Sequence, residues 1–373
     1  MKENIPSYKQ NDINAGMPIL DISKKISKYE FLPIWFWYTP VFIDMILQGF
    51  KYFNWKLPLI ANPTIKLSGI VGESKTEILD LAGPTAQKKI SPYITFTKDT
   101  NNINDLLNRI LPKIGEKGLS LPYVIKPDEG CRGVAVKVLH NLDEIKEYLK
   151  TFPIGFDFMI QRLIKFPAEA GIFYTRIPGQ EKGSIISFTL KYKPFIIGDG
   201  IKTLKELILA DERAGKLTDI YFPKFENKLD LIIPKDTQFP LSFVGNHGRG
   251  AIFKNGSQFI TEELKEAMDK VLKDVKGFYY GRLDIKFNDI NTFMKGKDFE
   301  IIEINGASSE SIHIWDNTTK FKDMFKALFK QYRILFKIGN AQRKLGVKSP
   351  KLSYLIKEWR REKALVKNYP TED

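Results

Sequence analysis

Hydrophobic and polar residues repeat with two different periods along the middle of the chain. A period of two is typical of strands with one buried face, and it marks several short runs separated by polar loops. Apolar residues spaced three and four apart predict helices over 142–150 and 262–276, which follow the capping residues Asn141 and Thr261. Between residues 84 and 320 strands alternate with helices, and the predicted strands cover 123–126, 134–138, 158–162, 172–176, 185–191, 195–197, 282–287 and 299–305.

The N-terminal segment, residues 1–83, is rich in aromatic residues. Its most apolar part, residues 31–50, has a longest uncharged run of 13 residues, whereas a membrane-spanning helix needs about 18 or more apolar residues. The pair Thr39-Pro40 predicts an N-cap and first turn, and therefore a helix over 41–53. A buried core helix is the favoured interpretation, and insertion into a membrane interface is the alternative.

Composition excludes several classes of protein. A hydrophobic fraction of 43% with 27% charged residues is typical of a globular protein rather than a disordered or fibrous one. The single cysteine, Cys131, excludes an internal disulfide framework and a zinc site built from several cysteines, and the three histidines argue against a histidine-rich metal site. The polar N-terminus has no secretory pattern, so a reducing, cytoplasmic setting is expected.

The net charge of +14 is concentrated near the C-terminus. Residues 320–373 hold 15 Lys and Arg against 5 Asp and Glu. We expect residues 321–373 to be a basic helical tail, with a solvated basic face favoured and contact with nucleic acid or an anionic membrane as the alternative. Its first helix is predicted to bury Phe321, Met324, Phe325, Leu328, Phe329, Tyr332, Leu335 and Phe336, and to turn Lys322, Lys326, Lys330, Arg333 and Lys337 outward.

The most informative stretch is GRLDIKFNDINTFMKGKDFEIIEING, residues 281–306, which predicts an antiparallel hairpin. Because side chains alternate across a strand, Arg282 and Asp284 share one face, and so do Glu303 and Asn305. Asp, Glu and Asn offer the oxygen ligands that suit Mg²⁺ shared with nucleotide phosphates, and an adjacent arginine can stabilise developing negative charge. The alternative is an ordinary amphipathic hairpin with a solvated polar face, which the poor strand former Asn305 makes less attractive.

A second stretch, LPYVIKPDEGCRGVAVKV, has the pattern of two strands joined by a glycine-containing loop. Backbone N–H groups of residues 128–133 can hold phosphate oxygens, and Lys126 adds a point charge. By itself the pattern also fits a glycine-rich hairpin turn. Cys131 has no histidine near it in the sequence, so we do not expect it to be a nucleophile.

Taken together, GRLDI, IIEIN, YVIKP and GDGIKTLKELI resemble the ATP-grasp superfamily, in particular ligases of the D-alanine–D-alanine ligase and cyanophycin synthetase type. The resemblance covers residues 84–320 and implies an α+β fold in which two subdomains hold ATP between antiparallel sheets. It implies Asp284, Glu303 and Asn305 as ligands of Mg²⁺ or Mn²⁺, and Arg282 as the transition-state arginine. The implied ATP contacts are Lys126, Glu129, Gly130, Arg132 and Gly133 at the phosphates, Gln161, Arg162 and Leu163 at adenine, Glu169 at the ribose, and Lys191 at a further phosphate.

Two features depart from the pattern of that family. After the metal-binding Asn the peptide ligases have a Pro-Gly segment, where this chain has Gly306-Ala307. SGIVGESK is faintly like the start of D-alanine ligases and would make Glu73 an amine-binding residue, but it lies only about 50 residues before Lys126, so residues 1–83 are expected to be a reduced substrate domain. Further candidates for substrate contact, with loop surface as an equal alternative, are His247, Arg249, Ser308, Glu310 and His313.

The resemblance implies an ATP- and Mg²⁺-dependent ligase that joins a small-molecule carboxylate to an amine through an acyl phosphate, with amino acids or peptide-like molecules as substrates. A small-molecule kinase is an alternative, because a fold does not fix the acceptor. A nucleotide-binding protein without activity, whose tail engages nucleic acid or membrane, is the other alternative. The intact set of Asp284, Glu303, Asn305 and Arg282 argues against it.

Overall fold

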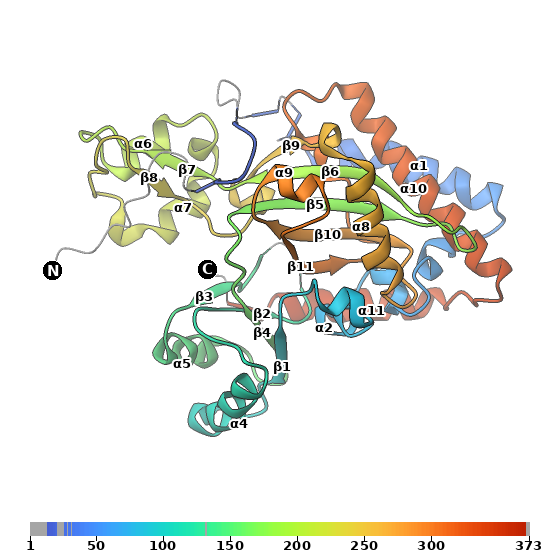
Figure 1. The fold of residues 1–373 in the computed structure, drawn as a ribbon, viewed down its shortest axis with the longest axis horizontal. Coiled ribbons are helices and arrows are strands. Elements are labelled where there is room, and N and C mark those ends of the chain that lie inside the picture. Colours follow the sequence, from blue (N-terminus) through green and yellow to red (C-terminus); the bar gives the residue numbers. More distant parts are fainter. Residues whose placement is uncertain (1–12, 21–25, 28, 31, 131–132, 371–373) are drawn as a thin grey trace.

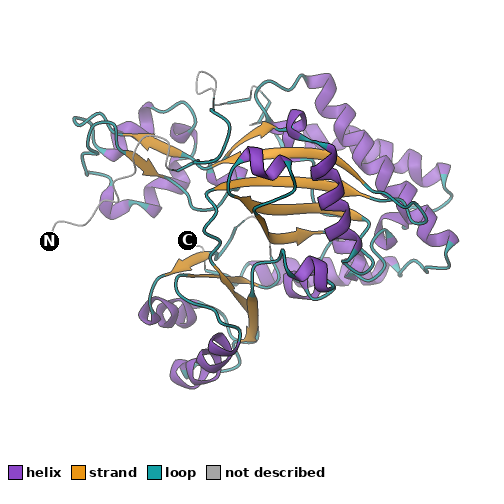
Figure 2. Cartoon of the chain, viewed as in Figure 1, coloured by secondary structure: helices purple, strands orange, loops and turns teal. Residues whose placement is uncertain are grey.

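Two antiparallel sheets form the body of the protein (Figures 1 and 2). The computed structural model describes residues 13–20, 26–27, 29–30, 32–130 and 133–370. The strands are β1 (Tyr93–Thr97), β2 (Tyr123–Pro127), β3 (Lys137–Leu139), β4 (Asp157–Arg162), β5 (Ala168–Thr175), β6 (Ser184–Tyr192), β7 (Phe195–Ile197), β8 (Gln238–Pro240), β9 (Ile252–Asn255), β10 (Tyr280–Phe287) and β11 (Phe299–Asn305). One sheet has the order β1-β4-β2-β3, the second β11-β10-β5-β6-β9, and β7 pairs with β8. The expected α+β class with antiparallel sheets is confirmed.

Helices cover the sheets (Figure 2). The α-helices are α1 (Ile34–Lys51), α2 (Lys75–Leu79), α3 (Pro84–Gln87), α4 (Ile103–Glu116), α5 (Leu142–Thr151), α6 (Leu204–Ala210), α7 (Thr218–Lys224), α8 (Glu262–Lys273), α9 (Ile290–Met294), α10 (Phe321–Lys344) and α11 (Leu352–Val366). Short 3-10 helices are η1 (Leu57–Ile60), η2 (Lys66–Gly69), η3 (Ala214–Lys216), η4 (Glu226–Lys228), η5 (His247–Arg249), η6 (Ser257–Phe259) and η7 (Ile312–Trp315).

The five-stranded sheet has one apolar and one polar face because its strands alternate. On β10, Leu283 and Ile285 pack into the main hydrophobic core together with the apolar side of α8. Figure 1 shows α8 crossing the near face of this sheet. The polar residues of β10 therefore point to the opposite face, and the predicted hairpin with β11 is confirmed.

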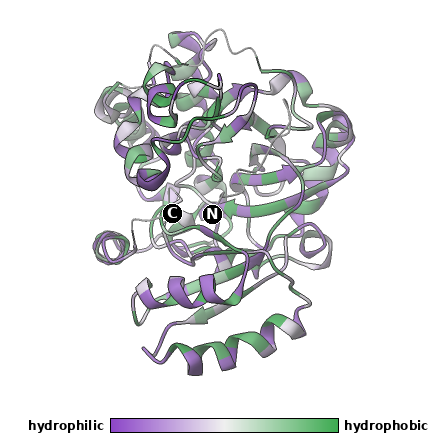
Figure 3. Cartoon of the chain, turned by 90° about the vertical axis from the view of Figure 1, so that its left-hand side faces the viewer, coloured by the Kyte–Doolittle hydropathy of each residue, from purple (hydrophilic) through white to green (hydrophobic). Residues whose placement is uncertain are grey.

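The four-stranded sheet is covered by α4 and α5, which share a second core with it. Asn102 and Asn141 cap these helices by accepting the N–H group three residues further on, as predicted for Asn141. Figure 3 shows hydrophilic and hydrophobic residues alternating along both helices, as expected for helices with one buried side.

Some element boundaries differ from the prediction. The strand expected over 134–138 begins only at Lys137, because Ala135 has a φ of 55°, which a strand does not allow. Helix α8 ends at Lys273 rather than at 276, and the carboxylate of Asp274 accepts the N–H groups of Thr85 and Ala86 in α3. The short strands β1, β8 and β9 were not predicted.

A small third unit is inserted between β6 and β9. It consists of β7, β8, α6 and α7 around a core of its own. At its entrance Asp199 accepts two backbone N–H groups, and Gly200 has a φ of 76°. Thr203 and Glu206 then form a capping box that starts α6. In this structure the GDGIKTLKELI segment, residues 198–208, forms a turn followed by the first residues of α6.

Helix α1 begins earlier than predicted. It runs from Ile34, so Pro40 lies inside it, where proline typically costs about 3 kcal/mol. The buried ring of Trp37 lies against Trp315 and Phe325, and this tertiary packing holds the turns before the proline in place. The expectation of a core helix is wrong, because α1 buries only the side that faces α10. Among the described residues no helix is long and apolar enough to cross a membrane.

Helix α10 divides its two sides as the sequence predicts. Met324, Leu328 and Leu335 are buried, whereas the five basic residues are exposed. Phe321 departs from the prediction and is 40% exposed, because it occupies the first residue of the helix. The buried side also contains Gln331, whose amide bonds two backbone groups of the loop after β11.

Candidate active site

The polar side chains of the β10–β11 hairpin gather on one side of the five-stranded sheet. Arg282 lies opposite Asn305, and Asp284 lies opposite Glu303. Directly opposed residues project to the same face, so the predicted cluster is formed; we call it the hairpin face. Gly171 of β5 lies next to Asp284, and a Cβ atom there would lie 3.3 Å from Cδ of Arg282. Glycine thus leaves room for the arginine.

Asp284 is the centre of an ion-pair network on this face. Its Oδ1 lies 2.9 Å from Nζ of Lys191 and 3.0 Å from Nε of Arg282. Lys191 also lies 3.3 Å from one oxygen of Glu169, and the other oxygen lies 3.2 Å from Nζ of Lys286. The structure therefore brings four predicted residues into direct contact. Lys286 was missed, although strand alternation places it on the same side as Asp284.

Burial opposes the charges in this network, and the neighbouring ions compensate for it. Burial would raise the pKa of Asp284, but Arg282 and Lys191 outweigh it and lower that pKa to about 2. Burial would likewise raise the pKa of Glu169, but Lys286 and Lys191 lower it. Both carboxylates are therefore ionised at neutral pH.

Lys126 approaches the hairpin face from the other sheet. It lies near the end of β2 and is 3% exposed. Burial lowers the pKa of Lys126 to about 8, while the carboxylates of Glu303 and Asp284 act to raise it. The predicted phosphate-binding lysine therefore lies within electrostatic reach of Glu303 and Asp284, two of the predicted metal ligands.

The loop after β11 is held by the N-terminal segment. Oε2 of Glu73 accepts the N–H of Gly306 at 2.9 Å, and the next two N–H groups donate to the carbonyls of residues 68 and 69. Burial, with a smaller contribution from the charge of Glu303, raises the pKa of Glu73 to about 8, so the Glu73 carboxyl is mainly protonated at neutral pH. With these three N–H groups already bonded, Arg282 is the donor best placed to meet an oxyanion.

The predicted phosphate loop, residues 128–133, is tied to α2. The ammonium of Lys75 donates to the carbonyls of Asp128 and Gly130 at 3.1 and 2.9 Å. Gly133, with a φ of 73°, approaches the side chain of Val244. Arg132 lies outside the described residues. Lys75 was not predicted, because nothing in its local sequence connects it with a loop more than 50 residues away.

Helix α11 also holds this loop. Arg361 forms an ion pair with Glu129 and lies 2.8 Å from Glu358, which in turn lies 2.7 Å from Lys66. The hydroxyl of Tyr369 donates to the Glu129 carbonyl at 2.8 Å. Contact of Glu129 with phosphate stays a prediction. The structural finding is that the distal tail packs on the loop, which the charge pattern of the tail did not indicate.

The residues predicted to meet adenine connect the two sheets. Gln161 is buried and donates to the backbone carbonyl of Ser91 at 3.3 Å and to one in β11 at 3.2 Å. Arg162 forms an ion pair with Glu300 of β11, and Leu163 is half-buried. Their contact with adenine stays a prediction, because the structure shows only how they hold β4 against β11.

A further lysine next to Glu169 was not predicted. Burial, together with the ammonium of Lys286, lowers the pKa of Lys193 to about 7. Both ammonium groups lie 5.9 Å from the ring of Phe243. Lys193 could have been found from its position two residues after Lys191, because residues two apart in an extended segment share a face. Lys193 lies just beyond the end of β6.

The predicted substrate residues of the 246–250 loop are packed against other parts of the protein. Nε2 of His247 lies 2.7 Å from Oε1 of Glu30, and its ring lies 5.6 Å from that of Trp315. Arg249 is half-buried and its carbonyl accepts the hydroxyl of Tyr221. Both residues therefore have structural partners, and their contact with a substrate stays a prediction.

The remaining candidates follow β11. Nδ1 of His313 shares a hydrogen bond of 2.7 Å with the hydroxyl of Ser187, and burial lowers the pKa of His313 to about 4, so the ring is neutral at pH 7. Burial raises the pKa of Glu310 to about 7, and its backbone carbonyl lies 3.5 Å from Nη1 of Arg282. Ser308 is exposed. The Glu310 carbonyl thus contacts Arg282 of the hairpin face.

The oxygen atoms of the hairpin face fit a magnesium ion shared with phosphates. Among the residues that the structure describes, no three His, Cys, Asp or Glu side chains form a metal cluster. Asp284 and Glu303 oppose each other, however, and Asn305 adds an amide oxygen on the same face. In nucleotide sites Mg²⁺ typically takes one or two carboxylates together with phosphate oxygens. The set therefore suits a metal–nucleotide complex rather than a metal held by protein alone.

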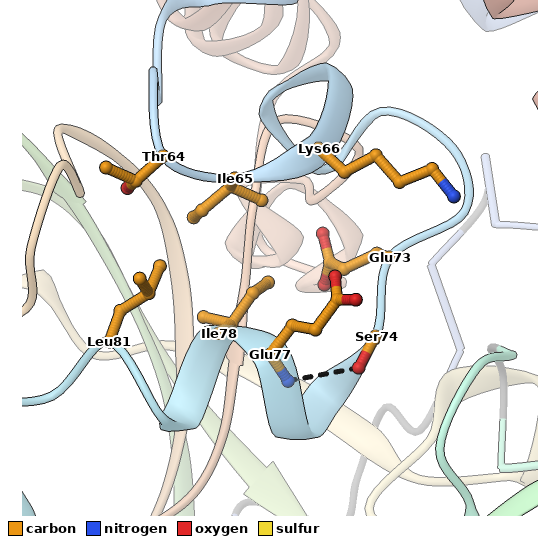
Figure 4. A pocket seen from close by; sticks show the side chains of 8 residues that line it. All are labelled: Thr64, Ile65, Lys66, Glu73, Ser74, Glu77, Ile78 and Leu81. Atoms are coloured by element: carbon orange, nitrogen blue, oxygen red, sulfur yellow. Dashed lines mark hydrogen bonds between the residues drawn. The ribbon is translucent and has the colours of Figure 1, made fainter.

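The small cavity beside Glu73 does not provide a substrate site. Its volume is about 20 Å³, which holds about one water molecule. In Figure 4, Ser74 caps α2 by accepting the N–H of Glu77, and Lys66 extends away from the cavity. Neither this cavity nor an open groove between α1 and α10 is lined by Lys126 or Arg282.

Comparisons with known proteins give matches among solved structures. No protein-family model and no curated protein matches the chain. A bifunctional glutathione synthetase from Pasteurella multocida is 14% identical, with 72% of this chain and 38% of that chain covered and a TM-score of 0.36. The VanG D-Ala:D-Ser ligase from Enterococcus faecalis is 12% identical, with 72% of this chain and 61% of that chain covered and a TM-score of 0.40. A D-alanine–D-alanine ligase from Bacillus anthracis is 16% identical, with 75% of this chain and 72% of that chain covered and a TM-score of 0.38.

These matches lie among the proteins that the sequence motifs resemble, and a further match, PsnB, is described as an ATP-grasp ligase. The chain spans only 38% and 61% of the first two structures. Because the identities are 16% or lower and the TM-scores stay below 0.5, any function has to be argued from the residues of the site.

Proposed function

We propose that this protein is an ATP-dependent ligase that joins a carboxylate to an amine through an acyl phosphate. The observation that supports this most is the hairpin face, where Arg282, Asp284 and Glu303 gather beside Lys191 and near Lys126 of the other sheet. Fixed cations next to hard oxygen ligands suit phosphoryl transfer, in which a protein contributes mainly positioning and charge stabilisation.

The reaction proceeds in two steps. A carboxylate oxygen of the substrate attacks the γ-phosphorus of ATP, the bond to the ADP oxygen breaks, and an acyl phosphate forms. The amine then attacks the acyl carbon, loses a proton, and expels inorganic phosphate to leave an amide. By the resemblance stated above, the substrates are amino acids or peptide-like molecules.

The residues of the hairpin face and the two lysines near it have separate roles in these steps. Lys126 and Lys191 bind phosphate oxygens, and Arg282 donates hydrogen bonds to the transferred phosphoryl group and to the oxyanion of the tetrahedral intermediate. Asp284, Glu303 and Asn305 would hold Mg²⁺ or Mn²⁺, and this ion neutralises phosphate charge when bound. On nucleotide binding, phosphate oxygens would replace the present partners of Lys191, and Asp284 would be free to hold the metal ion.

The test is product analysis after incubation with ATP, Mg²⁺ and a metabolite extract. We expect ADP, phosphate and a new amide in equal amounts, detected by mass spectrometry. Added hydroxylamine is expected to give a hydroxamate, because it intercepts an acyl phosphate. A stable phosphate ester without amide or hydroxamate would instead identify a kinase. Nucleotide binding with no turnover across the extract would identify a binding protein.

A further inference from the structure

Helix α1 exposes an apolar side that faces away from the rest of the protein. Its apolar residues recur at helical spacing, and the series continues past the end of the helix. The one acidic residue of α1, Asp44, is buried and pairs with Arg333 of α10. The apolar side consists of Trp35, Phe42, Ile43, Leu47 and Phe50, followed by Phe53 and Trp55, with exposed fractions between 54% and 91%.

Helix α10 lies beside α1 and presents a line of basic side chains. We call Lys322, Lys326, Lys330, Arg333 and Lys337 the α10 row. An open groove separates the two helices, with the α10 row and Phe325 on one wall and Lys51 and Tyr52 on the other. Among the described residues, Arg333 is the member of this row that forms an ion pair. Basic and apolar side chains thus lie on adjacent helices.

This combination matches the chemistry of an anionic membrane surface. Exposed aromatic and aliphatic side chains bind at the boundary of headgroups and acyl chains, and lysines bind anionic headgroups. Nucleic acid would satisfy the lysines but would leave the apolar side of α1 in water. In a symmetric dimer each subunit uses the same patch, and two copies of the α10 row would repel each other at such an interface.

We propose that α1 and the α10 row dock this protein on anionic phospholipid membranes as a peripheral protein. The apolar side of α1 inserts into the headgroup region, and the α10 row contacts the phosphate and carboxylate groups of the lipids beside it. This inference is independent of the ligase proposal, because it uses no residue of the hairpin face.

The test is co-sedimentation of the full chain with vesicles made of equal parts phosphatidylcholine and phosphatidylserine. We expect binding that weakens as salt is added and that falls at least tenfold on phosphatidylcholine alone. A Phe42→Ser, Leu47→Ser, Phe50→Ser variant should lose binding to both kinds of vesicle. A Lys322→Gln, Lys326→Gln, Lys330→Gln variant should lose about two orders of magnitude on anionic vesicles, at roughly fivefold per lysine.

The matched control is Lys88→Gln, Lys117→Gln, Lys137→Gln, which removes the same charge from exposed positions elsewhere. It should bind as the wild type does, and circular dichroism should show all variants folded. The proposal is overturned if the wild type does not bind the vesicles, or if the control variant loses as much binding as the α10-row variant. RNA binding without vesicle binding would assign the row to nucleic acid. A dimer that the Phe42, Leu47, Phe50 variant abolishes, again without vesicle binding, would assign the apolar side to a second copy.

Discussion

The hairpin face and the α10 row both place basic side chains on a regular element, but they do so in opposite surroundings. Beside the hairpin face, Lys191 of β6 is 4% exposed and lies within 3.3 Å of two carboxylates, one of them Asp284. The lysines of the α10 row are exposed, and the opposite side of α10 packs against the rest of the protein. The same residue type is therefore part of a buried network in one region and solvated in the other.

The difference teaches which charges the fold depends on. Buried ions lose their hydration, so removing one partner leaves the other uncompensated. Exposed lysines keep their water, and their loss changes stability little. We therefore expect substitutions on the hairpin face to alter folding or chemistry, and substitutions of the four lysines of the α10 row to alter only the binding of other molecules.

The largest effect on stability is expected for Lys191→Met. The substitution leaves Asp284 and Glu169 with one cation fewer in a buried site, which should cost about 3 kcal/mol of unfolding free energy. Urea unfolding measures it, with Lys330→Met on the α10 row as the matched control at less than about 0.5 kcal/mol. Equal losses in the two variants would remove the distinction between the two regions.

Arg282→Ala should affect the reaction more than the fold. If Arg282 supplies the proposed charge stabilisation, its loss should raise the activation free energy by roughly 2–4 kcal/mol, as for a lost oxyanion donor, and turnover should slow accordingly. Asp284 retains Lys191, so the protein should stay folded. Steady-state ADP release measures the effect, and Arg333→Ala, which removes an arginine from the α10 row, should leave turnover unchanged. Turnover within twofold of the wild type in Arg282→Ala would exclude the proposed role.

Glu73→Gln should change how stability depends on pH. The pKa of Glu73 is raised from 4.5 to about 8, so its contribution to stability is fully present below pH 4.5 and is lost as the pH rises through 8. Gln stays neutral and keeps an acceptor for the Gly306 N–H. Relative to the wild type, the variant should therefore gain stability between pH 5 and pH 7, by about 2–3 kcal/mol.

Thermal or urea unfolding across this pH range measures that difference. Glu77→Gln is the control, because Glu77 lines the same small cavity but is exposed. A difference between Glu73→Gln and wild type that does not grow with pH would show that Glu73 is already ionised in the folded protein.

The smallest effect on stability is expected on the α10 row. The Lys322→Gln, Lys326→Gln, Lys330→Gln variant should unfold within about 0.5 kcal/mol of the wild type, because solvated lysines contribute little. The same urea experiment measures it. A loss of several kcal/mol would mean that the row is part of the packing and not a surface for binding.

The hairpin face could be predicted because it depends on local alternation. Side chains alternate along each of two consecutive strands, so the shared faces of Arg282 with Asp284 and of Glu303 with Asn305 followed directly from their spacing. The exposed lysines of α10 followed from helical spacing in the same way. In both regions the pattern lies within one helix or within two consecutive strands, so it can be recognised in the sequence.

What the sequence could not predict are contacts between distant segments. The bond from Gly306 to Glu73 joins residues 233 positions apart, and the ion pair of Arg361 with Glu129 joins residues 232 apart. No periodicity encodes such pairs. The early start of α1 was missed for a related reason, since packing of Trp37 against other segments overrides the local signal of Pro40.

The most direct test of the central claim is ATP cleavage by wild type and Glu303→Gln, each with and without the extract that supplies the substrates. This change removes one ligand charge without altering the size of the side chain. For the wild type we expect slow ADP release alone and fast release with the extract, matched by amide and trapped as hydroxamate when hydroxylamine is added. A folded Glu303→Gln protein should lose most of the extract-dependent release. Wild-type turnover in that variant would contradict the proposal that the hairpin face is the catalytic centre.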